Sequence, residues 1–131
     1  KNEPKAFGRA MDDDAGAMSG WWVLSAIGLH QPLIGEPIYY LSVPFFEEGR
    51  IQQVKKALTI RKKGNLSDRY IANVELNGKM LNRVWVTRDE LANGGELLIT
   101  TSAGPTEFGF DQPWISNYSN PSKQGCFQSK K

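Results

Sequence analysis

The feature that most constrains this chain is a helix-like segment, Ala15 to Gly28, that is apolar on almost every side. Three acidic residues, Asp12 to Asp14, precede it, where carboxylates favour a helix start and one of them can cap it. Gly28 is a typical helix end. A helix without a wide polar face is normally buried inside a large protein. Since 131 residues offer few ways to surround it, we expect one buried helix that belongs to something larger.

The remaining sequence is β in character. Asn77-Gly78 is a strong hairpin signal, because a type I′ turn needs positive φ at both positions. Thr87 to Glu90 matches a capping box, which predicts a short helical turn from Thr87. Short alternating apolar stretches predict strands at 38–43, 57–61, 70–76, 81–86 (the return strand of the hairpin) and 96–101. We therefore expect a mainly β fold, an antiparallel β-sandwich preceded by the buried helix.

Composition divides the chain into three parts. Residues 1–30 are interpreted as a loop followed by the helix, and residues 31–115 as a β domain. Residues 116–131 are polar and lack periodicity, so we expect a poorly ordered tail.

Simple counts exclude several classes of function. Sixteen Lys and Arg against fourteen Asp and Glu leave a formal charge of +2, which argues against nucleic acid as a partner. No apolar run approaches the roughly 18 residues of a membrane span. The single cysteine, Cys126, excludes an internal disulfide and a cysteine-based metal cluster, and the single histidine, His30, excludes a site with two imidazoles.

Asp12 and Asp14 are the first candidates for chemistry. On an extended loop, residues two apart point to the same side, and two such carboxylates can hold one water or one hard cation. They cannot by themselves flank a glycosidic bond, because an inverting glycosidase needs its two carboxyl groups about 6.5–9.5 Å apart. A catalytic role would require an acid from another segment. The alternative is that both are solvated charges at a helix start.

Other candidates are weaker. Trp21 and Trp22 point about 100° apart on a helix, so at most one can line a shared cleft, and core packing is the better interpretation of most aromatic residues here. His30 follows the helix end, where we expect a structural role. Cys126 has no His or Asp pattern around it, so we expect no catalytic thiol.

Residues 12–29, DDDAGAMSGWWVLSAIGL, resemble a signature of glycoside hydrolase family 92, the calcium-dependent exo-α-mannosidases, approximately G-[ND]-x-D-x-G-Q-M-S-A-W-Y-V-x-S-A-L-G-[FL]. The segments 35–46, 76–85 and 94–97 are similar, in order, to later segments of that family. The matching pieces extend from about residue 8 to about residue 110.

The resemblance implies a fragment. Family members are several hundred residues longer, with an N-terminal β-sandwich, an (α/α)₆ catalytic toroid and closing C-terminal strands. This chain is similar to the last loop and helix of the toroid plus the C-terminal β part. We call the full-length protein that it would come from the parent. The rest of the parent chain would then be its partner, together with a mannose-containing glycan.

The resemblance also implies chemistry. The family hydrolyses terminal α-mannose with inversion, here expected at α-1,2 linkages, and a calcium ion helps to bind and distort the sugar. The general acid is a Glu on an earlier segment. Carried over by position, Asp14 is the general base, and Asp12 orients the attacking water or reaches calcium, directly or through water. The fragment alone should be inactive. Periplasmic or extracellular localisation follows from the resemblance, since family members are commonly exported by bacteria.

The sequence departs from the signature beside the two aspartates. Ala17 replaces the family's Gln, Gly20 its small residue before Trp, and Trp22 its Tyr, while Met11 stands where Gly is usual. Ala17 would change the site if that Gln contacts the sugar or the ion.

Two other functions remain open. The chain can be a non-catalytic β-sandwich module that binds carbohydrate or protein through an exposed aromatic such as Trp114. It can also be a structural brace, with Asp12 and Asp14 as helix charges only.

Overall fold

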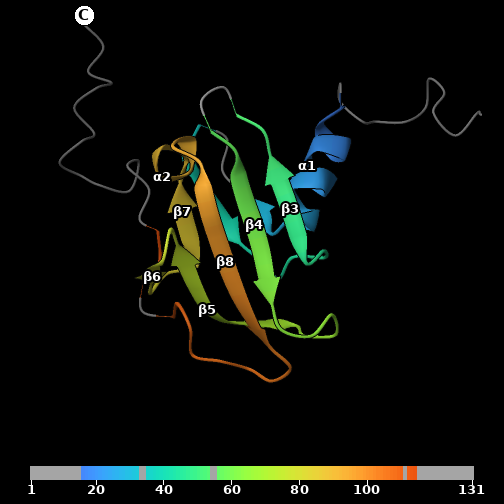
Figure 1. The fold of residues 1–131 in the computed structure, drawn as a ribbon, viewed down its shortest axis with the longest axis vertical. Helices are drawn as coiled ribbons and strands as arrows, with labels where there is room; N and C mark the ends of the chain where they lie inside the picture. The colour runs from blue at the N-terminus through green and yellow to red at the C-terminus, as the bar shows by residue number, and fades with distance from the viewer. Residues whose placement is uncertain (1–15, 33–34, 54–55, 111, 115–131) are drawn as a thin grey trace, which may run out of the picture.

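The computed structural model describes residues 16–32, 35–53, 56–110 and 112–114. In these residues eight strands form two sheets, accompanied by two short helices, so the expectation of a mainly β fold is confirmed (Figure 1). The elements are α1 (Ala17–Ala26), β1 (Leu29–His30), β2 (Ile38–Leu41), β3 (Glu48–Ile51), β4 (Leu58–Lys63), β5 (Tyr70–Leu76), β6 (Lys79–Leu81), β7 (Trp85–Thr87), α2 (Arg88–Ala92) and β8 (Gly95–Ser102). No helix within these described ranges is long and apolar enough to cross a membrane.

The predicted N-terminal helix is present as α1, but it is not buried in this structure. None of its residues is buried, and residues 17–23 are exposed. Within α1, Leu24 near the C-terminal end packs on the hydrophobic core. The 131 residues alone therefore do not bury this helix, and its burial within a larger protein stays a prediction. The N-cap is Gly16 in a left-handed conformation, not one of the aspartates, and glycine has no side chain with which to cap.

The smaller sheet has the order β1-β2-β7, and both of its pairings are antiparallel. β1 follows α1 directly and pairs Leu29 with Leu41 and His30 with Tyr40. This pairing joins the end of the segment 1–30 to the β domain that begins at residue 31.

The larger sheet has the order β3-β4-β8-β5-β6. Its pairs are antiparallel except β4 and β8, which run parallel from Leu58 opposite Gly95 to Lys63 opposite Thr100. The expected wholly antiparallel sandwich therefore differs at this pair. The physical reason is the connection: the chain leaves the sheet after β6, forms β7 and α2, and returns as β8 between β4 and β5.

The hairpin at Asn77-Gly78 is confirmed. Asn77 has φ 52° and Gly78 φ 76°, and the Asn77 side-chain oxygen accepts a hydrogen bond from the Glu96 N–H at 2.9 Å. The return strand is β6, however, and the predicted strand 81–86 is wrong as one element. The chain crosses between sheets after Leu81, so residues 85–87 form β7 of the smaller sheet.

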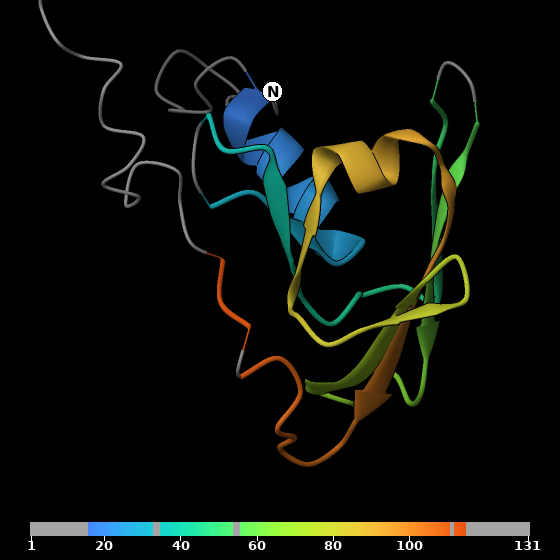
Figure 2. The ribbon, with the colours of Figure 1, turned by 90° about the vertical axis from the view of Figure 1, so that its left-hand side faces the viewer.

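The core lies between the two sheets and beneath α2. Figure 2 shows both helices toward the same end of the molecule. Aliphatic side chains from both sheets and from α2 form one buried cluster: Leu29, Leu41, Leu58, Ile60, Val74, Leu76, Leu81, Val86, Leu91, Leu97 and Ile99. The buried residues of β5 and β8 alternate, as expected for strands with one face on a core.

Candidate functional site

Asp12 and Asp14 lie outside the described residues, so their predicted roles remain predictions. The structure describes the helix that follows them: α1 begins at Ala17, directly after Gly16.

The C-terminal end of α1 is fixed to the loop after β2. The Phe45 N–H donates to the Ala26 carbonyl at 2.8 Å, and the Ser42 N–H donates to the Gly28 carbonyl at 3.0 Å. Gly28 has φ +90°, and a Cβ there would lie 2.9 Å from Pro44 Cγ and from the Ser42 carbonyl oxygen. The turn after α1 therefore requires glycine, as the sequence predicted for the helix end.

His30 connects the N-terminal half of α1 to the smaller sheet. The Trp21 Nε1–H donates to His30 Nδ1 at 3.1 Å, and the two rings meet edge to face with their centroids 6.4 Å apart. Because Nδ1 accepts this bond, it carries no proton in this arrangement. The expected structural role of His30 thus takes the form of a tether between β1 and α1.

The outward face of α1 is apolar. Trp21 is 52% exposed and Trp22 58%, and Met18 and Val23 are exposed beside them. Together with Phe45 and Phe46, whose rings meet edge to face, they place six large exposed apolar residues on or next to this helix. A large exposed apolar patch on a soluble protein usually marks a site that contacts another protein surface or a ligand.

A hollow of about 580 Å³ lies between α1, α2 and the neighbouring ends of β3 and β4. Its floor is aliphatic, from Leu24, Leu29, Ile51, Leu58 and Leu91. The Gln53 amide, at its rim, donates to the Leu91 carbonyl at 3.1 Å. The hollow is therefore a second apolar region, next to the C-terminal part of α1.

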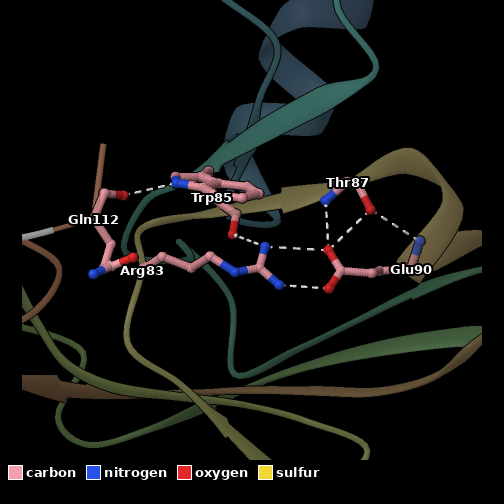
Figure 3. A network of polar contacts seen from close by, with 5 residues as sticks. All are labelled: Arg83, Trp85, Thr87, Glu90 and Gln112. Atoms are coloured by element: carbon pink, nitrogen blue, oxygen red, sulfur yellow. Dashed lines mark hydrogen bonds and ion pairs between the residues drawn. The ribbon is translucent and has the colours of Figure 1, made fainter. Parts of the chain in front are cut away.

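A polar network fixes α2 (Figure 3). Thr87 Oγ1 accepts from the Glu90 N–H at 3.2 Å, and Glu90 Oε2 accepts from the Thr87 N–H at 2.9 Å, so the predicted capping box is confirmed. The Arg83 guanidinium grips both carboxylate oxygens of Glu90 and also donates to the Trp85 carbonyl at 2.8 Å.

The ionised form of Glu90 is favoured by this network. Burial raises the pKa of Glu90, but the hydrogen bonds from Arg83 and Thr87 outweigh burial and hold this pKa below its ordinary value. The two charged groups of the network pair with each other, so we assign it a structural role.

The aromatic residue exposed near the C-terminal end is not Trp114, as the carbohydrate-binding alternative expected. Trp114 is half-buried and packs edge to face on Trp85, with centroids 4.9 Å apart. Phe110 is the exposed aromatic of this region, at 79%. The carbohydrate-binding alternative therefore cannot depend on an exposed Trp114, because that ring is used for packing.

A metal centre is not formed by the described part of the chain alone. No group of three or more His, Cys, Asp or Glu side chains converges within residues 16–32, 35–53, 56–110 and 112–114. The predicted ligand, Asp12, lies before this part.

Comparison with known proteins identifies the class. The model of the glycosyl hydrolase family 92 catalytic domain matches residues 1–103. That match takes in the acidic residues 12–14, α1 and all strands of both sheets, so it places the chain among glycoside hydrolases. The chain belongs to glycosyl hydrolase family 92.

Individual relatives agree with this assignment. An uncharacterised secreted glycosidase of Arthroderma benhamiae is 32% identical over 106 residues, 77% of this chain and 14% of that protein. The family GH92 inverting mannosidase BT2199 of Bacteroides thetaiotaomicron has a TM-score of 0.63 at 31% identity, over 72% of this chain and 13% of its own. The GH92 family glycosyl hydrolase ccman5 has a TM-score of 0.75 at 27% identity, over 84% and 15%. The chain thus spans about a seventh of the length of these relatives.

Sequence reasoning missed two features near this end of the chain. Arg83 carries no local signal, because its partner Glu90 is brought to it only by the turn into α2. Phe110 was not singled out among the aromatic residues, and only its 79% exposure distinguishes it from Phe108, which packs against the core.

Proposed function

We propose that this chain is the part of a family 92 exo-α-mannosidase that supplies the general-base side of the active site. The parent would remove terminal α-linked mannose, with α-1,2 linkages as the expected substrate. One observation carries the proposal: the family's catalytic-domain model matches a range that contains both Asp12 and Asp14 and continues through α1.

In this proposal Asp14 takes a proton from the water that attacks the anomeric carbon, and Asp12 orients that water. Inversion requires the acid on the opposite face of the sugar, about 6.5–9.5 Å from the base. A Glu from an earlier part of the parent would supply it. The support is the ordered resemblance together with the relative BT2199, which is named an inverting mannosidase.

Calcium belongs to the proposal through Asp12. A carboxylate is a suitable ligand for this hard cation, which takes six to eight oxygen ligands. Since the described residues offer no cluster of three acidic or imidazole groups, the other ligands would come from the parent. When bound, the ion would help to hold and distort the sugar.

The exposed surface of α1 supports a proposal for its place in the parent. We propose that it is the last helix of an (α/α)₆ toroid and that the parent covers its apolar face. The support is the exposure of Trp21 and Trp22, and the fact that relatives are about seven times longer than the matched part. We also propose that the parent is exported, because the matched relative in Arthroderma benhamiae is named a secreted glycosidase.

The test is the Asp14→Asn variant of the parent, assayed on an aryl α-mannoside. Loss of a general base lowers kcat by about 10²–10⁴-fold. Asp13→Asn is the matched control, because it removes the same charge from the residue between the two proposed catalytic aspartates. An unchanged rate in Asp14→Asn would leave only the brace function. Following the anomer by NMR tests inversion in the same reaction.

The isolated 131-residue chain should not hydrolyse the aryl mannoside, because it lacks the proposed acid. Calcium-dependent turnover by the isolated chain would refute this division of the site.

A further inference from the structure

The segment after β8 is a loop that is held at both of its ends. Thr106 Oγ1 donates to the Ile71 carbonyl, and Phe108 packs against the hydrophobic core. Gly109, at φ +78°, lies so close to Val84 that a Cβ would collide with it. The inward residues Thr106 and Phe108 thus alternate with Glu107, which is exposed.

The far end of this loop is fixed by Trp85. Its indole N–H donates to the Gln112 carbonyl at 2.8 Å (Figure 3). Its ring also packs against Trp114. The Arg83 guanidinium lies over the same indole ring, 4.1 Å from its centroid. Gln112 is therefore held in place through its backbone.

This loop encloses a hollow of about 300 Å³ with the residue that follows β6. Three planar polar side chains line it, and they come from Asn82, Glu107 and Gln112. In the hydrogen bonds and ion pairs formed among the described residues, none of these three side chains takes part. Their amide and carboxylate groups offer donors and acceptors on one small surface.

Phe110 stands at this hollow with its ring exposed to solvent. At 79% exposure it is the most exposed large apolar side chain of the described chain. An aromatic ring next to planar amides and a carboxylate suits an uncharged pyranose. The apolar C–H face of the sugar packs on the ring, while neighbouring hydroxyls bond to the polar groups.

We propose that Asn82, Glu107, Phe110 and Gln112 form a carbohydrate-binding exosite for neutral hexopyranose units. The loop lies well away from α1 (Figures 1 and 2, in orange). It would hold a glycan chain separately from the residue being cleaved. The proposal takes its choice of sugar, mannose, from the proposed function, but the binding itself does not depend on hydrolysis.

The direct test is a titration of the 131-residue chain with α-1,2-mannobiose, followed by NMR at the backbone amides. Saturable millimolar shifts are expected at residues 82, 107–110 and 112. Phe110→Ala should weaken binding at least tenfold. Phe45→Ala is the matched control: Phe45 is 76% exposed but lies next to α1, so its loss should leave the affinity unchanged.

Two variants of Glu107 distinguish the contribution of hydrogen bonding to sugar binding from that of net charge. Glu107→Gln keeps a planar acceptor and should bind within about threefold of the natural chain, whereas Glu107→Leu should lose most binding. Each variant's spectrum must keep the dispersion of the natural chain. No saturable shift at the loop, or equal losses in Phe110→Ala and Phe45→Ala, would overturn the exosite.

Kinetics of the parent provide an independent measurement. Phe110→Ala should raise KM for an oligomannoside severalfold and leave hydrolysis of a small aryl mannoside unchanged. Equal KM values on the oligomannoside would contradict the exosite. The two proposals fail separately, because Asp14→Asn acts on kcat for both substrates and Phe110→Ala only on KM for the long one.

Discussion

Single residues with unusual backbone conformations shape the loop that forms the proposed exosite. Gly109 combines a positive φ with a close approach to Val84. Non-glycine residues adopt this region only with strain. The sequence did not reveal this requirement, because Val84 precedes β7 and meets Gly109 only in the folded chain. By contrast, Asn77-Gly78 was predicted correctly, since both turn residues and their strands are adjacent in sequence.

Gly109→Ala should destabilise the chain by about 1–3 kcal/mol, through backbone strain and the collision with Val84. Gly104→Ala is the control within the same loop, because no atom lies within 4 Å of its Cβ position, and we expect a change below about 0.5 kcal/mol. Urea denaturation of both variants measures the difference. Equal stabilities would show that the loop adjusts freely around Gly109.

At the scale of elements, the Arg83–Glu90 network joins the crossover between the sheets to α2. The capping box was readable from Thr87 and Glu90 alone, since its spacing is local. The bidentate contact between Arg83 and Glu90 could not be read from the sequence, because the two side chains meet only when the chain turns through β7 into α2. The same crossover explains why the predicted strand 81–86 is two elements in different sheets.

Glu90→Gln should lower stability by about 1–3 kcal/mol near neutral pH, because it removes a partly buried charge that Arg83 needs. The pKa of Glu90 is lowered by folding, so its ionised form favours the folded state. The contribution is complete above the ordinary pKa of about 4.5 and is lost as the pH falls through the lower, folded-state pKa. The variant and the natural chain should therefore converge in stability in acid.

Denaturation at a series of pH values checks this expectation. Glu47→Gln, at an exposed position in the loop before β3, is the control and should change stability little at any pH. A Glu90→Gln deficit that persisted unchanged in strong acid, well below the ordinary pKa of the carboxyl group, would contradict the assigned role of the ionised carboxylate.

On the scale of the whole molecule, the feature that needs an explanation is the exposed apolar surface of α1. The sequence predicted a helix apolar on almost every side, and the structure leaves residues 17–23 of it exposed. The family match covers residues 1–103, and the matched relative is about seven times longer than the part it shares with this chain. We therefore propose that the remainder of the parent covers this surface.

Trp22→Ala should affect the stability of the isolated chain and of the parent differently. In the isolated chain Trp22 is 58% exposed, so its removal should change stability by less than about 1 kcal/mol. In the parent, where we propose that it is buried, the loss should be about 3–5 kcal/mol. Thermal unfolding of both proteins measures this contrast, with Phe110→Ala as an exposed aromatic control. Equal effects would argue against burial of α1.

The sequence by itself determined what depends on neighbours along the chain: a helix before residue 28, a tight turn at Asn77-Gly78, the capping box at Thr87 and the membership in family 92. Tertiary structure alone decided the parallel β4–β8 pair, the Trp21–His30 bond, the Arg83–Glu90 contact and the hollow beside Phe110. These features join groups that are distant in sequence. Periodicity and spacing describe local geometry, whereas the packing of two sheets decides which distant side chains meet.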